Sequence, residues 1–223
     1  METKEKKYMM LACRNIEDEI EAAMREYEVE YPVLYLQSGT HDKPDYMHRT
    51  LQEIIDSLTG IDYLLLPMGR CGNATLGLRS DRFSIVLPKC DDCINLLLSE
   101  NSLKVDRPHA SMFYTAGWMR SSRSAANEYD STTAKYGKDQ ADMIMQMIYG
   151  GYKHFSLLDT GLYDMDKAER ILTPLATCVS VDMPRIKAPY GVLKKMVALE
   201  LDNENFAVIP PGTEVTEEML SLE

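Results

Sequence analysis

The sequence predicts an α/β fold with a mostly parallel sheet and helices on both of its faces (doubly wound, three-layer). Three observations lead to this expectation. Strand-like and helix-like segments alternate along the chain, which is typical of βαβ units. Some strand candidates are almost continuously apolar, as expected of strands that are covered on both faces. Polar loops with glycine or proline separate these segments, and such residues favour turns.

Each predicted strand is a short run rich in apolar, β-branched and aromatic residues. Tyr63–Met68 is the clearest, because it follows Gly60 and is almost wholly apolar. Phe83–Leu87 is similar and breaks at Pro88. The predicted strands are Tyr8–Cys13, Val33–Gln37, Tyr63–Met68, Phe83–Leu87, Met112–Thr115, Phe155–Leu158, Thr177–Asp182 and Phe206–Ile209.

Each predicted helix carries apolar residues three and four positions apart. In the first helix Asn15 can cap the amino end, and acidic residues follow it in the first turn, where they suit the helix dipole. Gly137 can interrupt the longest helix. The predicted helices are Asn15–Tyr27, Tyr46–Leu58, Ile94–Leu98, Ser124–Tyr149, Met165–Leu172 and Tyr190–Leu201.

The chain length favours one domain with added elements. A chain of 223 residues is long for one domain and short for two. We expect residues 1–213 to form a single α/β domain. Pro210, Pro211 and Gly212 then introduce an acidic segment, 214–223, for which we expect mobility.

Charge and composition exclude several classes of partner. The net charge is −11 and the basic residues are dispersed, which argues against nucleic acid. No apolar run is long enough to cross a membrane. The amino-terminal residues lack the features of a secretory signal, so we expect a cytoplasmic protein. The sequence lacks the phosphate-binding motif GxxxxGK[ST], the serine-hydrolase motif GxSxG and the dinucleotide-binding motif GxGxxG. These absences argue against a nucleotide-dependent enzyme and against a serine hydrolase.

Four cysteines give the strongest indication of a site. Cys13, Cys71 and Cys90 follow predicted strands at their carboxyl ends, and Cys93 completes a CxxC turn with Cys90. Because the carboxyl ends of parallel strands open on one edge of a sheet, these four thiols can converge there. Four thiolates suit zinc or an iron–sulfur cluster. The alternative is that two of them are simply packed, because cysteine is often buried.

The CxxC turn also allows a metal-free redox pair. Cysteines at the start of a helix can form a thiol–disulfide couple. Asp91 and Asp92 lie between the two thiols and oppose the formation of a thiolate. Cys178 lies in a strand-like run and is expected in the core.

Other residues are candidates for the lining of the same site. Gly69 and Gly72 flank Cys71 and permit close backbone approach, and Asn73 follows them. Asp159 ends a predicted strand in the tripeptide Asp-Thr-Gly and is our candidate catalytic group, as a proton acceptor. Trp118 can supply an aromatic wall, with core packing as the alternative.

Several of these segments together resemble a known family. LPKCDDCINLLL, GRCG, FYTAGW, LLDTGLYD and VIPPG are similar to the landmarks of the uncharacterised "domain of unknown function 1638" family, across nearly the whole chain. The resemblance implies an anaerobe setting beside corrinoid-dependent methyltransferases, with a corrinoid protein, a methyltransferase or a small molecule as partner. The family commonly has His where this chain has Asp91, so a role for an imidazole there is not expected.

The sequence as a whole predicts a cytoplasmic protein with a Cys-ligated metal centre. Zinc or an iron–sulfur cluster is the expected cofactor, and a corrinoid can be supplied by a partner. The expected role lies in or beside corrinoid-dependent methyl transfer or one-carbon metabolism, through methyl-transfer or redox chemistry if the protein is an enzyme. The alternatives are a metal-free CxxC oxidoreductase and a non-enzymatic accessory protein that binds a corrinoid or another small molecule.

Overall fold

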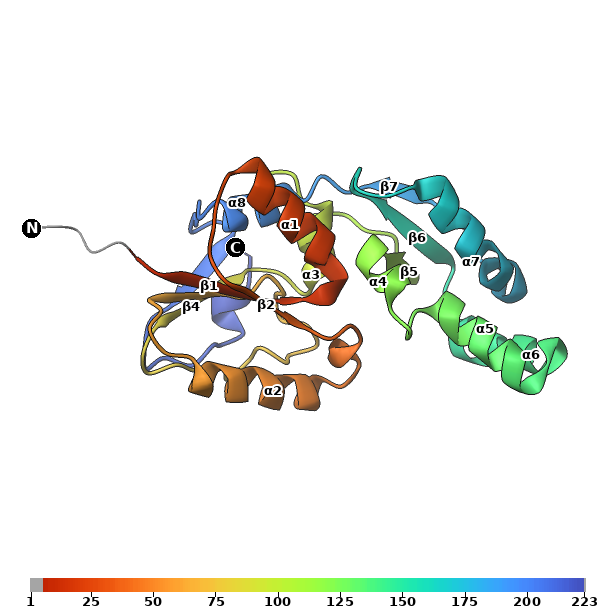
Figure 1. The fold of residues 1–223 in the computed structure, drawn as a ribbon, viewed down its shortest axis with the longest axis horizontal. Coiled ribbons are helices and arrows are strands. Elements are labelled where there is room, and N and C mark those ends of the chain that lie inside the picture. Colours follow the sequence, from red (N-terminus) through yellow and green to blue (C-terminus); the bar gives the residue numbers. More distant parts are fainter. Residues whose placement is uncertain (1–5, 223) are drawn as a thin grey trace, which may run out of the picture. The chain divides into compact units, whose positions relative to one another are not determined.

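The structure is a computed structural model that describes residues 6–222. Its chain divides into two compact units, each with its own sheet (Figure 1). Of the described residues, unit 1 comprises 6–105 and 190–222, and unit 2 comprises 106–189. Each unit is described by itself below.

Unit 1 is built on a five-stranded, mostly parallel sheet. Its strand order is β2-β1-β3-β4-β8. The first four strands are parallel to their neighbours, and β8 pairs with β4 in the antiparallel direction. The strands are β1 (Tyr8–Cys13), β2 (Val33–Leu36), β3 (Tyr63–Leu65), β4 (Ser84–Pro88) and β8 (Phe206–Ile209).

Helices cover both faces of this sheet (Figure 1). The helix α2 (Pro44–Ser57) lies on one face, where Met47, Leu51 and Ile55 are buried against apolar strand residues. On the other face lie α1 (Glu17–Glu26), α3 (Cys93–Leu98) and α8 (Gly191–Val197), with α8 packed against both α1 and α3. Short 3-10 helices are η1 (Arg14–Ile16), η2 (Thr40–Asp42) and η3 (Glu218–Leu220).

The interior strand β1 shows why a nearly continuous apolar run forms here. Met10, Leu11 and Ala12 are consecutive and fully buried. Successive strand residues point to opposite faces of a sheet, so both faces must be covered at this point. Leu11 belongs to the core on the α2 side.

Unit 2 has a three-stranded parallel sheet in the order β5-β6-β7. Its strands are β5 (Ser111–Tyr114), β6 (His154–Asp159) and β7 (Arg185–Lys187). Its helices are α4 (Ala116–Arg120), α5 (Ala125–Tyr136), α6 (Lys138–Tyr149) and α7 (Met165–Val179). A separate apolar core, which includes Tyr114, Phe155 and Leu172, joins the helices to the sheet.

The predicted α/β class with mostly parallel sheets is confirmed. One strand prediction is wrong: Thr177–Asp182 is not a strand, because α7 continues through Pro174 to Val179. Leu172, Leu175, Ala176 and Val179 are buried along α7, so helical packing outweighs the β-branched composition of this segment. Cys178 accordingly lies on a helix, half-buried against the core of unit 2.

The segment after Gly212 packs against unit 1. The N–H of Val215 donates to the carbonyl of Leu78 at 2.9 Å, and the N–H of Gly77 donates to the carbonyl of Val215 at 2.8 Å. Leu220 is buried in the core. Apolar side chains thus anchor a segment whose acidic composition suggests mobility. The expectation of one domain over residues 1–213 stays a prediction, because compact units can be parts of one folding domain.

No helix within residues 6–222 is both long enough and apolar enough to cross a membrane.

Candidate metal centre

The four cysteines come from one edge of the sheet of unit 1. The strands β1, β3 and β4 are parallel neighbours, so their carboxyl ends open on the same edge. Cys13 is the last residue of β1. Cys90 follows the end of β4, Cys71 lies in the loop after β3, and Cys93 is the first residue of α3.

Backbone hydrogen bonds hold the Cys71 loop beside the CxxC turn. The N–H of Arg70 donates to the carbonyl of Cys90 at 2.9 Å, and the N–H of Cys71 donates to the carbonyl of Asp91 at 2.7 Å. The buried hydroxyl of Thr75 donates to the carbonyl of Gly69 at 2.9 Å. Two loops that are distant in sequence are therefore joined next to their cysteines.

Gly69 lies where the two loops approach closely. A Cβ atom at this position would lie 2.5 Å from the carbonyl oxygen of Cys90 and 2.8 Å from its sulfur. The backbone of Gly69 also has a φ of +59°, which side chains rarely tolerate. Gly72, Cys71 and Asn73 likewise have positive φ values, so this loop is a tightly folded segment and not an extended one.

The thiols lie close enough to influence each other electrostatically. Burial raises the pKa of Cys71 to about 12, and the neighbouring Cys13 and Asp92 add to this rise. Burial raises the pKa of Cys93 as well, and Asp92, Cys13, Cys71 and Cys90 contribute in that order. Because thiolates repel one another, several of these thiols can ionise together only if a cation compensates their charge.

The pKa of Cys13 is also raised, chiefly by burial. The N–H of Asn15 opposes this rise by a hydrogen bond to the thiol, and Asp42 contributes to it. Cys13 therefore lies in a buried environment like that of Cys71, although the two residues come from different strands.

The four thiols lie at the same edge of the sheet, but they do not surround a common point. Among residues 6–222, no three His, Cys, Asp or Glu side chains are arranged as a group that could hold a metal ion. The thiol of Cys90 donates to the carbonyl of Asp92 at 3.3 Å. Binding of a metal by Cys90 would require its side chain to leave this partner. The donor set, with four sulfur atoms, suits zinc and iron–sulfur clusters.

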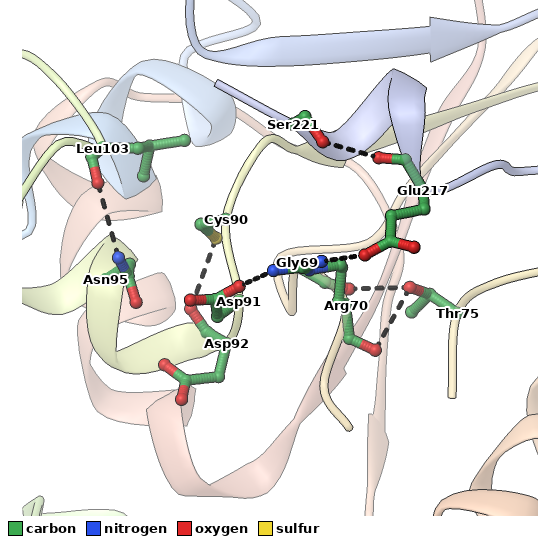
Figure 2. A network of polar contacts seen from close by, with 10 residues as sticks. All are labelled: Gly69, Arg70, Thr75, Cys90, Asp91, Asp92, Asn95, Leu103, Glu217 and Ser221. Carbon is green, nitrogen blue, oxygen red and sulfur yellow. Dashed lines mark hydrogen bonds and ion pairs between the residues drawn. The ribbon is translucent and has the colours of Figure 1, made fainter. Parts of the chain in front are cut away.

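Arg70 joins both cysteine loops to the carboxyl-terminal segment. Its guanidinium forms ion pairs with Asp91 and with Glu217, the latter at 2.7 Å (Figure 2). Sequence reasoning did not identify this residue, because nothing in the sequence near Arg70 indicates partners 21 and 147 positions away. The negative charge of Asp91 is thus engaged with a cation.

Asp92 caps the helix that begins at Cys93. Its carboxylate accepts a hydrogen bond from the N–H of Ile94 at 3.0 Å, which is the usual contact of an N-cap residue. The same carboxylate raises the pKa values of Cys71 and Cys93. An acidic residue before a helix is a signal that could have identified this cap from the sequence.

The remaining predicted site residues, Asp159 and Trp118, belong to unit 2. Asp159 is exposed at the end of β6, and its carboxylate accepts a hydrogen bond from the N–H of Gly161 at 3.1 Å. Trp118 is buried in α4 and is part of the core of unit 2. The centre described above consists of unit 1 residues alone, and the roles of Asp159 and Trp118 stay predictions.

Two cavities lie away from the cysteines. One of about 370 Å³ is lined by residues that include Tyr63 and Ser84, the first residues of β3 and β4, and so lies at the opposite edge of the sheet. Another of about 610 Å³ lies on α6 and is lined by residues that include Met143 and Met147. Neither has a cysteine in its lining.

Comparison with known proteins places most of the chain in one family model. The model, described as "Protein of unknown function (DUF1638)", matches residues 35–197. This match includes Cys71, Cys90 and Cys93, and it begins after Cys13. The searches of curated proteins and of solved structures found no match to the chain.

Proposed function

The chain belongs to the family described as "Protein of unknown function (DUF1638)", and from its own residues we propose that it is a cytoplasmic metalloprotein. In this proposal Cys13, Cys71, Cys90 and Cys93 hold zinc or an iron–sulfur cluster. The centre acts in or beside corrinoid-dependent methyl transfer or one-carbon metabolism.

One observation carries the proposal: four cysteines lie at one edge of one sheet. They come from the end of β1, from the loops after β3 and β4, and from the start of α3. The thiols of Cys13, Cys71 and Cys90 all raise the pKa of Cys93. Two of these thiols, Cys13 and Cys90, are buried, and as packing groups alone they contribute little that apolar side chains would not supply. A bound cation would offset the mutual repulsion of the thiolates.

The surrounding backbone supports a role in metal binding. Gly69 lets the two cysteine loops approach closely, and the hydrogen bonds of Arg70 and Cys71 fix their relative position. Zinc bound to thiolates can act as a Lewis acid toward a thiol, whereas a cluster supplies electrons at low potential. In either case the chain itself would orient the sulfur ligands and exclude water from Cys13 and Cys90, which are buried.

The link to corrinoid chemistry rests on the family resemblance. A corrinoid protein or a methyltransferase is the partner that we propose on this ground. Both zinc and iron–sulfur chemistry suit such a partner, so the identity of the partner does not determine which metal is bound.

A metal-free CxxC oxidoreductase is less well supported. Such enzymes stabilise one thiolate, so that its pKa falls below the usual value for cysteine. In this chain the first cysteine of the turn, Cys90, is buried, and its thiol donates to the carbonyl of Asp92 at 3.3 Å, a contact that only the protonated form makes. Burial and Asp92 also raise the pKa of the second cysteine, Cys93.

Metal analysis and an absorption spectrum of the anaerobically purified protein test the proposal. We expect either one zinc per chain and no visible absorption, or iron and sulfide with the broad visible absorption of a cluster. A protein with neither metal, and with all four thiols freely titratable after reconstitution, would contradict it.

A further inference from the structure

Arg70 links the loop that contains Cys71 to the CxxC turn. It immediately precedes Cys71, and its N–H donates to the carbonyl of Cys90 at 2.9 Å. Its guanidinium pairs with Asp91, which lies inside the CxxC turn. A single residue thus contacts the CxxC turn through both its backbone and its side chain, as Figure 2 shows for the side chain.

The second partner of Arg70 belongs to a segment that is anchored independently. Glu217 lies 2.7 Å from the guanidinium. On one side of it, Val215 forms two backbone hydrogen bonds to the chain at Gly77 and Leu78. On the other side, Leu220 is buried, with 2% of its surface exposed. Glu217 is therefore held in place by its neighbours in the chain and can hold Arg70 in turn.

We propose that Arg70 is a positioning residue that sets the spacing between Cys71 and the CxxC turn, and that the carboxyl-terminal segment 214–222 maintains this spacing through Glu217. This inference rests on the proposed function, because it concerns the metal that the same cysteines bind. It adds a residue and a segment that do not touch the metal.

The physical basis is the geometry of the guanidinium. Its planar group presents several N–H donors in fixed directions, so it can bind two carboxylates at once and restrain both. The side chain of Arg70 is 29% exposed, and those of Asp91 and Glu217 are 56% and 68% exposed. Partly exposed ion pairs of this kind contribute little to the free energy of unfolding. Groups that orient metal ligands nevertheless change metal affinity by about 10–100-fold.

Cobalt(II) binding to the metal-free full chain tests this role. The absorption of cobalt thiolates reports the ligands, and competition with a chelator reports the affinity. We expect Arg70→Met to weaken cobalt affinity about tenfold, while the urea-unfolding midpoint of the metal-free protein stays close to that of the wild type. Glu217→Gln, a milder change at an exposed residue, should weaken affinity in the same direction. The double variant should be no weaker than Arg70→Met alone.

Arg79→Met is the matched control. Arg79 lies in the same unit and is 47% exposed, and its guanidinium pairs at 2.8 Å with Asp81, which belongs to neither cysteine loop. We expect its cobalt affinity to equal that of the wild type. Equal affinities for Arg70→Met and Arg79→Met, or additive effects of Arg70→Met and Glu217→Gln, would overturn the inference while the proposed function stands. A wild-type chain that binds no metal through thiolates would overturn both.

Discussion

Gly69 determines how closely the two cysteine loops can approach, because there is no space for a side chain against Cys90. Cys71 and Cys90 come from loops after different strands, and their proximity depends on this contact. At the scale of single residues, the proposed centre therefore depends on the absence of a Cβ atom at Gly69 as well as on the cysteines.

We expect Gly69→Ala to lower the free energy of unfolding by about 1–3 kcal/mol, as overpacking does, and to reduce metal binding. The added Cβ would contact the carbonyl oxygen and sulfur of Cys90. Urea unfolding and metal content measure the two effects.

Gly60→Ala provides the control for this substitution. Gly60 also has a positive φ, +76°, but a Cβ there would meet no atom within 4 Å. The difference in unfolding free energy between the two variants therefore reports the steric clash with Cys90, separately from the backbone strain that both variants share. Equal destabilisation by both, with metal binding intact, would contradict the role assigned to Gly69.

The residues of the centre were only partly predictable from the sequence. The positions of Cys13, Cys71 and Cys90 after strands follow from local patterns, since strand ends are marked by turn residues. Arg70 was not predictable, because its partners Asp91 and Glu217 are brought near by the fold alone. Long-range ion pairs leave no periodic or local signal in a sequence.

At the scale of elements, α7 shows a competition between local propensity and packing. Thr177 and Val179 are β-branched, which favours a strand, yet both lie in the helix. Pro174 lies within α7 on its exposed side, where water can satisfy the carbonyl that lacks a hydrogen-bond donor. The rule that a helix ends before a proline therefore predicts the end of α7 too early, at Leu172 instead of Val179.

Asp164 begins the same helix and gives a prediction about pH. Its carboxylate accepts a hydrogen bond from the N–H of Lys167 at 2.9 Å, and this bond lowers the pKa of Asp164 below 3.8. A carboxyl whose pKa is lower in the folded state stabilises that state above the unfolded pKa, and the stabilisation is lost as pH falls through the folded pKa.

Asparagine caps helices about as well as aspartate, so Asp164→Asn removes the charge and keeps the cap. We expect the wild type to have the higher melting temperature at neutral pH, and the difference to shrink as pH falls below 3.8. Melting curves followed by circular dichroism across this range measure it. A difference that is independent of pH would show that the charge of Asp164 does not contribute.

At the scale of the whole molecule, the cysteines of the centre all belong to unit 1, whereas unit 2 has its own sheet and core. The alternation of strands and helices predicted the α/β class. It did not predict the division into units, because helices and strands alternate in both of them. Which strands share a sheet depends on long-range pairing that alternation does not encode.

This division predicts that a core defect in unit 2 leaves metal binding intact. Leu172 is fully buried in the core of unit 2, and Leu172→Ala should cost about 2–5 kcal/mol of stability. We expect the metal content per folded chain to equal that of the wild type. Leu51→Ala, in the core of unit 1, is the matched substitution. Loss of metal on Leu172→Ala but not on Leu51→Ala would contradict a centre built from unit 1.

The central claim is that cysteines from separate strands share one metal centre. Substitution of Cys13 tests this claim most directly, because Cys13 comes from β1 and lies outside the region matched by the family model. The measurement is metal content per chain after anaerobic reconstitution of Cys13→Ser and Cys178→Ser. We predict that Cys13→Ser loses most of the metal and that Cys178→Ser, a cysteine of unit 2, retains all of it. Full metal content in Cys13→Ser would contradict the claim.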